Sequence, residues 1–228
     1  MIVAAITIKH QWRIAMSQHD IEQGSEAWKA MRLGKVTASR VADLMARTRT
    51  GWGASRANYM AELIVERLTG QPADSYQNAA MRWGIETEPQ ARDAYQFFAD
   101  VDVVQVGFVD HPRIAMSGCS PDGLIGDSGL VEFKCPATST HIETLLTGAV
   151  PARYATQMLW QMACTERQWC DYVSFDPRMP EHVRYWCKRV HRDEKLIEEL
   201  EREVGAFLAE LSGKIGQLQA KYPERLAA

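Results

Sequence analysis

The sequence predicts an α/β fold in which helices flank a central mixed β-sheet. Segments with helical spacing of apolar residues fill the first hundred positions, and segments rich in β-branched residues follow them. Helical spacing then returns twice, with two further strand-like segments in between. The 228 residues contain no internal repeat, low-complexity tract or linker, so we expect these elements to form one domain.

Cap residues and glycines bound the helices predicted in the N-terminal part. Ser25 is a predicted N-cap, and Gly34 follows the end of the same helix. Three further helices are predicted, from Thr37 or Ser39 to Arg47, from Ser55 to Gly70 and from Tyr76 to Asp100. The part of the chain before the sheet is therefore expected to be helical.

The following elements are bounded by turn residues. Strands are predicted at 101–110, 113–119, 129–136, 169–175 and 182–190. Two helices are predicted among them, from Pro151 to Thr165 and from Asp193 to Tyr222. The predicted core includes Leu63, Phe97, Val104, Phe133, Leu159, Val173 and Leu208.

Composition indicates an ordinary globular protein. Hydrophobic residues make up 46% and charged residues 24%, and no apolar run approaches the about 18 residues that a membrane span needs. The five cysteines include no Cys-x-x-Cys pair, which argues for free thiols in a reducing cytoplasm and against a zinc ribbon. Residues 1–16 lack a basic leader and a small-residue cleavage site, so we expect no signal peptide.

The net charge of −3 is unevenly distributed. Residues 32–56 contain six basic side chains and one acid, whereas residues 193–210 contain seven acids and two basic side chains. A solvated helix face best explains the acidic run. The basic run fits such a face and a polyanion-binding surface equally well.

The predicted hairpin 119–136 carries acids at Asp122 and Glu132 and a lysine at Lys134 on what should be one surface. Strand side chains alternate between faces, so Glu132 and Lys134 share one polar face. Asp122 and Glu132 are symmetric about Asp127, and a reversal there would bring their Cβ atoms within about 4.5–5.5 Å. Two carboxylates at such a short separation repel each other, unless one of them holds a proton or a cation lies between them.

Two explanations for this hairpin stay open. Pro-Asp-Gly is a common turn and Glu-x-Lys a common edge pattern, so the charges could simply be solvated. Alternatively, the acids bind Mg²⁺ or Mn²⁺, hard cations that share their coordination with substrate phosphates. Such a site would cleave phosphodiesters, with Lys134 orienting or deprotonating the attacking water or stabilising the developing charge.

Acids and amides elsewhere could complete a metal site. Glu86 and Glu88 lie on the helix predicted before the sheet, either as a third carboxylate or as surface acids. In the helix that follows the hairpin, Tyr154, Gln157 and Gln161 form a polar face that lines either an active site or solvent.

Arg32 and Ser39 suggest a phosphate pocket. A helix N-terminus with a hydroxyl group and a nearby arginine favours phosphate. Alternatively, Arg32 interacts only with the C-terminal dipole of its own helix, and Ser39 only caps the next one.

Six motifs occur in order between Ala27 and Met179: AWKAMRLGKVTAS, RWGIETE, CSPDG, LVEFKCP, YATQ and FDPRM. With them the chain resembles the phage lambda exonuclease family, the YqaJ-type viral recombinases or alkaline exonucleases of the PD-(D/E)XK nuclease superfamily. The resemblance implies a restriction-endonuclease-like core within one nuclease domain over residues 1–228. In it, a helical part of about 1–100 contacts the DNA end, about 101–190 form the catalytic sheet, and about 193–222 form the C-terminal helix.

The resemblance also implies a function. It implies an exonuclease that digests one strand of duplex DNA from a phosphorylated 5′ end and leaves a 3′ overhang for a single-strand annealing protein. Mg²⁺ is the implied cofactor, with two ions per site and Mn²⁺ as a substitute. A ring-shaped homotrimer is implied, encoded by a phage or prophage and active in the cytoplasm of a bacterial host.

Site residues carry over motif by motif. Catalytic roles fall on Asp122, Glu132, Lys134, Glu88 and Gln157, and metal binding falls on Asp122, Glu132 and the Phe133 backbone carbonyl. Contacts to DNA and the 5′ phosphate fall on Arg32, Ser39, Ser120 and Thr140. The best-known family member has an arginine where this chain has Thr140, so the pocket is weaker here or is completed by His141 or Arg153.

Two rivals remain. An endonuclease on the same core, whether restriction, nicking or junction-resolving, would use the same metal residues but would not need an end-binding pocket. A non-catalytic DNA-binding recombination protein would be favoured by loss of Asp122, Glu132 or Lys134, and all three are present.

Overall fold

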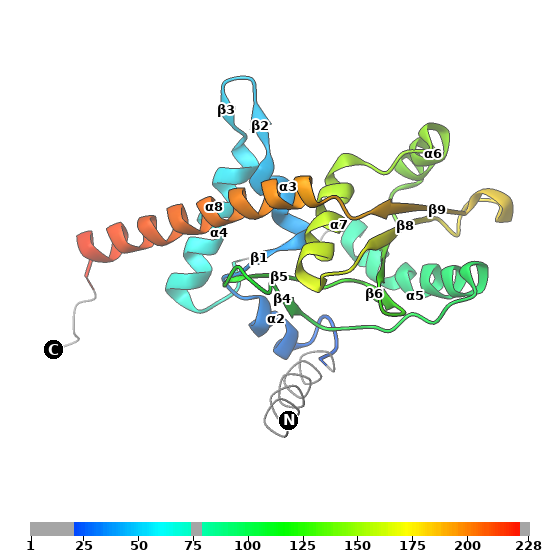
Figure 1. The fold of residues 1–228 in the computed structure, drawn as a ribbon, viewed down its shortest axis with the longest axis horizontal. Helices are drawn as coiled ribbons and strands as arrows, with labels where there is room; N and C mark the ends of the chain where they lie inside the picture. Colours follow the sequence, from blue (N-terminus) through cyan, green and yellow to red (C-terminus); the bar gives the residue numbers. More distant parts are fainter. Residues whose placement is uncertain (1–20, 74–78, 224–228) are drawn as a thin grey trace, which may run out of the picture.

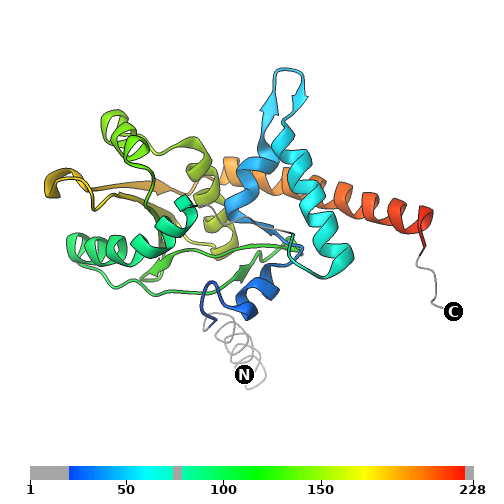
Figure 2. The same cartoon turned by 180° about the vertical axis from the view of Figure 1, so that it is seen from behind.

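The structure is a computed structural model that describes residues 21–73 and 79–223. It confirms the α/β fold, with helices on both faces of a central sheet (Figures 1 and 2). The expectation about residues 1–16 concerns positions outside the described ranges, and so does the predicted start of the fourth helix at 76–78.

Four strands form the central sheet in the order β6-β7-β8-β9. Their bounds are Gly123–Ile125, Gly129–Lys134, Trp169–Phe175 and Tyr185–His191. The β7–β8 pair is parallel, and the β6–β7 and β8–β9 pairs are antiparallel. Because parallel neighbours need a crossover, the chain passes through α6 (Thr138–Thr147) and α7 (Ala152–Thr165) between β7 and β8.

Side-chain alternation along β7 divides the core into two clusters. On one face, Leu130 packs in a cluster with Met158 of α7 and Phe207 of α8 (Glu194–Lys221). On the other face, Phe133 packs in a cluster with Tyr95 of α5 (Ala79–Ala99). Since side chains two residues apart share a face, Glu132 lies on the face of Leu130, toward α7.

The predicted helices form with the predicted boundaries. In α2 (Glu26–Arg32), the Trp28 backbone N–H donates to the N-cap Ser25 Oγ. Thr37 is the N-cap position of α3 (Ala38–Met45), and Gly70, with φ +66°, ends α4 (Ala54–Thr69). Within the part of the chain that the structure describes, no helix is long and apolar enough to cross a membrane.

A small sheet has the order β1-β5-β4, made of Val36–Thr37, Ser117–Cys119 and Val109–Asp110. Strands β4 and β5 are shortened forms of the predicted strands 101–110 and 113–119, whereas β1 and the short elements that follow have no counterpart in the sequence predictions. A hairpin of β2 (Arg47–Thr48) and β3 (Gly51–Trp52) projects from the body in both ribbon views. Strands of two residues are too short for an alternation pattern, and the threonine-rich α6 has weak helix propensity.

Two predicted core residues are exposed. Phe97 is 80% exposed, because α5 buries Thr87, Ala91 and Tyr95 at four-residue intervals and Phe97 falls outside that stripe. Val104 is 58% exposed and makes only an isolated bridge to Leu124, so the predicted strand 101–110 is reduced to Val109–Asp110. The other five predicted core residues are buried or pack against the core.

Candidate active site

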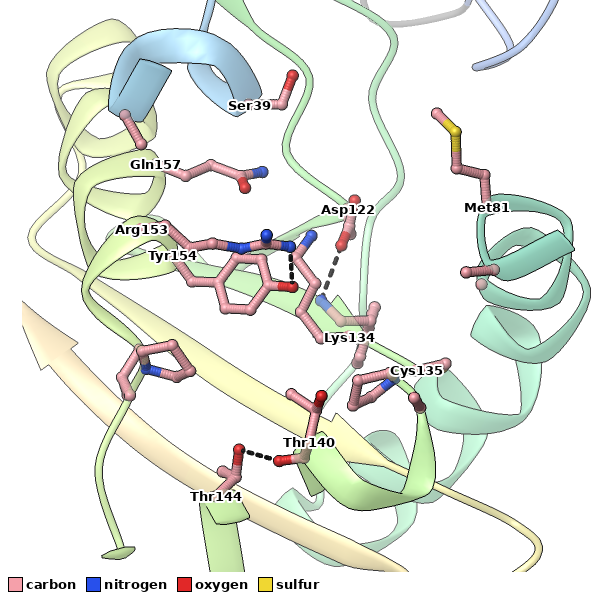
Figure 3. A pocket seen from close by; sticks show the side chains of 18 of the residues that line it. Ser39, Met81, Asp122, Lys134, Cys135, Thr140, Thr144, Arg153, Tyr154 and Gln157 are labelled. Carbon is pink, nitrogen blue, oxygen red and sulfur yellow. Dashed lines mark hydrogen bonds between the residues drawn. The ribbon is translucent and has the colours of Figure 1, made fainter. Parts of the chain in front are cut away.

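The β6–β7 hairpin brings the two predicted acids to matching positions. Gly123 pairs with Val131 and Ile125 with Gly129, so the same register places Asp122 opposite Glu132, with the reversal where the sequence predicted it. The Phe133 backbone N–H donates to Asp122 Oδ2 at 2.7 Å, which fixes this carboxylate beside the catalytic strand (Figure 3).

Glu132 is almost completely buried, at 1% exposure, and both carboxylate oxygens accept hydrogen bonds from α7. Gln157 Nε2 donates to Oε1 and Gln161 Nε2 donates to Oε2, each at 2.6 Å. The Lys134 ammonium also donates to Oε1. The amide face of α7 therefore lines the site and not solvent, which settles one of the alternatives left open by the sequence.

Electrostatics make this cluster a receptor for positive charge. Burial, and then the negative charge of Glu132, raise the pKa of Asp122 well above its usual value. Burial lowers the pKa of Lys134, but the charges of Glu132 and Asp122 outweigh it, so the net shift is upward and the side chain is an ammonium at neutral pH. One ammonium therefore faces two closely placed carboxyl groups.

A cleft of about 990 Å³ opens over this cluster. Its walls come from α3, α5, β7, α6 and α7, and Figure 3 shows Asp122 and Lys134 at its centre with Gln157 above them. Among the described residues that line it, four are acidic (Asp43, Glu88, Asp122 and Glu143) and two, Lys134 and Arg153, are basic. An acidic cleft holds a phosphodiester only if cations are supplied.

Glu88 lies in the wall formed by α5 and lines the cleft, whereas Glu86 is exposed on the same helix and does not. Arg92 Nη2 donates to Glu88 Oε1 at 2.6 Å. The negative charge of Glu88 contributes to raising the pKa of Asp122, so the two groups interact electrostatically. Of the two acids considered, the structure brings Glu88 to the site.

The residues present fit a hard divalent cation. Within residues 21–73 and 79–223, no three His, Cys, Asp or Glu side chains gather into a metal-binding group. Asp122 and Glu132 supply two carboxylates, and Mg²⁺ typically takes only one or two from a protein, with water and phosphate oxygens completing the octahedron. The Phe133 carbonyl is the further oxygen expected from the resemblance, and its N–H already holds Asp122.

Arg32, Trp28 and Ser120 form a second polar cluster. Arg32 Nη1 and Trp28 Nε1 both donate to Ser120 Oγ, at 3.2 Å and 2.9 Å. The guanidinium carbon lies 4.2 Å from the Trp28 ring centroid, and burial lowers the pKa of Arg32. Arg32 thus contacts Ser120, two residues before Asp122, and is not limited to an interaction with its own helix dipole.

Ser39 lines the cleft in the first turn of α3. The N-cap position of this helix belongs to Thr37, so the capping role considered for Ser39 is wrong. Figure 3 shows Ser39 over the same opening as Asp122. Its hydroxyl group is therefore placed as the phosphate-pocket hypothesis requires.

The structure shows which side chains surround Thr140, the position of the missing family arginine. Thr140 lines the cleft, but His141 is fully buried, with hydrogen bonds to Ser174 Oγ at 2.7 Å and the Val183 carbonyl at 2.8 Å. His141 therefore cannot complete a phosphate pocket. Arg153 lines the cleft instead, with its guanidinium donating to Tyr154 Oη at 2.5 Å (Figure 3).

Two contacts at the site were not assigned from the sequence. Gln161 was placed on the amide face but given no role, and its four-residue spacing from Gln157 was the available signal. Trp28 was not considered, because nothing in the sequence indicates that its N–H meets Ser120, 92 residues away.

The sheet, its flanking helices and the carboxylate-lysine cluster together define a nuclease with a PD-(D/E)XK core. The model of the YqaJ-like viral recombinase domain matches residues 27–168. The chain belongs to this family, which is the family of lambda exonuclease.

Solved structures support the same assignment. The chain is 56% identical to an alkaline exonuclease (LHK-Exo) from Laribacter hongkongensis, with a TM-score of 0.81 over 86% of this chain and 97% of that one. The complex of LHK-Exo with dAMP gives a TM-score of 0.82 at the same identity and coverage. A phage related exonuclease from Haemophilus somnus 129PT, 16% identical, shares the fold, with a TM-score of 0.67 over 81% and 96% of the two chains. No curated protein matches the sequence.

Proposed function

We propose that the protein is a Mg²⁺-dependent exonuclease that digests one strand of double-stranded DNA from its 5′ end and leaves 3′ single-stranded overhangs. The observation that carries the proposal is the Asp122–Glu132–Lys134 cluster, of which Asp122 and Lys134 line an acidic cleft, together with the hydrogen bond from Arg32 to Ser120, two residues before Asp122. Family membership and the exonuclease relatives support the reaction class.

The chain's own residues divide the chemistry. Bound Mg²⁺, with Mn²⁺ as a substitute and two ions per site, would neutralise the phosphate and acidify a water molecule. Asp122 and Glu132 would hold the cations, and Gln157 and Gln161 fix the orientation of Glu132. Because Lys134 is an ammonium, it donates a hydrogen bond and stabilises negative charge, rather than accepting a proton. Glu88 faces the same space from the opposite wall.

The terminal phosphate is proposed to bind next to the carboxylates. Arg32 supplies a half-buried guanidinium that donates to Ser120, and Ser39 supplies a hydroxyl group at the helix N-terminus. Thr140 and Arg153 line the far side of the cleft, so Arg153 is the cation that compensates for the absent family arginine. Such a pocket favours binding of a DNA end and would have no use in an endonuclease.

Further proposals rest on family membership alone. They are that residues 1–228 act as one nuclease domain, that three copies assemble into a ring around DNA, and that a single-strand annealing protein takes over the 3′ overhang. A phage or prophage origin and action in the bacterial cytoplasm belong to the same set.

End-labelled linear duplex is the substrate that tests the proposal. With Mg²⁺, a label on a 5′-phosphorylated end should be released as mononucleotide at once, and a 3′ label should stay on long single strands. Covalently closed circular duplex should remain intact, since it offers no end. Cleavage of the closed circle would favour the endonuclease rival, and binding without any cleavage would favour the non-catalytic rival.

A further inference from the structure

The FDPRM motif ends the central strand β8 and takes no part in the chemistry proposed above. Asp176 is fully buried there, and a buried carboxylate must be compensated by charge and hydrogen bonds. Arg178 Nε donates to Oδ1 at 2.7 Å and Arg178 Nη2 donates to Oδ2 at 2.9 Å, in a bidentate pair. Thr138 Oγ1 adds a hydrogen bond to Oδ2 at 2.6 Å.

The same guanidinium reaches two walls of the cleft. Arg178 Nη2 also donates to the carbonyl of Pro136, a cleft-lining residue that follows β7, at 3.1 Å. The guanidinium carbon lies 4.3 Å from the ring centroid of Trp83 on α5. Arg178 itself does not line the cleft. It therefore connects the exit of the catalytic strand with the helix on the opposite wall.

Helix α5 carries Glu88 five residues beyond Trp83, about 7.5 Å along the helix axis. Its neighbours Met81, Gly84 and Ile85 line the cleft as well. Strand β7 carries Lys134 two residues before Pro136. Trp83, which contacts Arg178, thus lies within two helical turns of Glu88. Pro136, its other contact, lies two residues from Lys134, so the two residues that Arg178 contacts are close in sequence to groups on both sides of the cation-binding space.

We propose that Arg178 is a positioning residue that sets the spacing between helix α5 and the end of strand β7, and hence the place of Glu88 relative to Asp122. The inference rests on the proposed function, because it concerns the geometry of the cation site. A planar guanidinium can form a bidentate ion pair and stack on an indole at the same time, which a lysine ammonium cannot do.

The chain offers a matched control in Arg189. Arg189 forms the same bidentate pair with the buried Asp171, at 2.8 Å for both bonds, and stacks on Trp169 at 3.5 Å. Its side chain is 46% exposed, like that of Arg178. None of Arg189, Asp171 and Trp169 lines the cleft. Loss of either arginine removes a bidentate pair with a buried aspartate. Asp171 keeps a hydrogen bond at 2.9 Å from Tyr95 of α5, which does not line the cleft, whereas Arg178 contacts the cleft-lining Pro136 directly.

The experiment compares Arg178→Lys, Arg178→Ala and Arg189→Ala in the full chain, by calorimetric titration with Mg²⁺, by thermal unfolding and by duplex digestion. We expect both Arg178 variants to bind Mg²⁺ about 10-fold more weakly and to need correspondingly more Mg²⁺ for half-maximal digestion, which is the usual effect of losing a residue that supports metal ligands. Arg189→Ala should lower the melting temperature to a similar degree and leave both Mg²⁺ midpoints unchanged.

If Arg178→Lys and the wild type have equal Mg²⁺ midpoints, the positioning role is overturned. It is also overturned if the Mg²⁺ midpoints rise as much in Arg189→Ala as in the Arg178 variants. Arg178→Lys keeps the charge and decides the matter if Arg178→Ala does not fold. A wild-type protein that binds no Mg²⁺ and digests no duplex would overturn the proposed function instead, and with it the premise of this inference. The two failures are thereby distinguishable.

Discussion

The carboxylate cluster of Asp122 and Glu132 and the guanidinium cluster of Arg32 are linked through Ser120, two residues before Asp122, yet their charges are arranged in opposite ways. In the first, carboxylates outnumber the one ammonium that faces them. In the second, a half-buried guanidinium has a serine and a tryptophan as partners, and no carboxylate pairs with it among the described residues.

The difference shows what each cluster is missing. Two closely placed carboxylates are completed by a cation, and a half-buried guanidinium without a counter-charge is completed by an anion. Ser120 and Asp122 are separated by one residue, so a metal-bound phosphate group could satisfy both clusters at once. The comparison therefore predicts different losses when each cluster is damaged.

The largest effect is expected from the carboxylate cluster. Replacing Lys134 with alanine should lower the digestion rate about 10²–10³-fold, because it removes from the reacting centre the one cation that contacts Glu132 among the described residues. Mg²⁺ binding should persist, since both carboxylates remain. Single-turnover digestion and calorimetric Mg²⁺ titration measure the two quantities, and retained digestion would exclude Lys134 from the chemistry.

A smaller and more selective effect is expected from the guanidinium cluster. Arg32→Ala should slow digestion of 5′-phosphorylated ends about 10-fold or more and 5′-hydroxyl ends much less, because only the phosphate loses a charged partner. Lys29→Ala is the control, since Lys29 lies on the same helix but is exposed and paired with Glu26. An equal loss on both kinds of end would contradict the pocket assignment.

The two clusters also differ in how well the sequence predicts them. The register of Asp122 and Glu132 follows from local symmetry about Asp127, so hairpin geometry alone places them opposite each other. The partners of Arg32 come from 88 residues away, at Ser120, and no periodic pattern encodes that contact. Local pairing is readable from one sequence, whereas contacts between distant segments depend on packing.

The same reason explains the errors in the fold. The strands β7, β8 and β9 and the long helices have enough residues to show a period, and the bounds of the three strands were predicted to within three residues. Phe97 and Val104 are apolar but lie on the outer side of their elements, where composition alone does not reveal orientation. From the sequence, His141 was a candidate for the phosphate pocket. Its side chain instead forms hydrogen bonds with Ser174 and Val183, on the side of α6 that faces the sheet.

A still smaller effect is expected at Arg153, a second positively charged side chain proposed to bind the DNA backbone in the cleft. Arg153→Ala should slow digestion a few-fold and make it more sensitive to salt, because one contact with the DNA backbone is lost. Adding Thr140→Arg to this variant should restore the rate, since it returns an arginine to the same cleft. Rates measured over a series of salt concentrations test both steps, and no rescue would separate the two positions functionally.

The smallest effect concerns stability, and it tests the charge of the carboxylate cluster separately from catalysis. Because burial and Glu132 raise the pKa of Asp122 above that of an unfolded aspartate, its bound proton stabilises the fold at low pH, and that contribution is lost as the pH rises through the folded value. Asp122→Asn removes the titrating group and keeps an oxygen for the Phe133 N–H. At neutral pH without metal, the variant should melt about 2–4 °C higher than the wild type, which corresponds to about 1 kcal/mol for a chain of this size. Added Mg²⁺ should raise the melting temperature of the wild type and not that of the variant. If the variant melts lower without metal, or gains as much from Mg²⁺ as the wild type, the carboxylate pair is not the uncompensated charge that the cation completes.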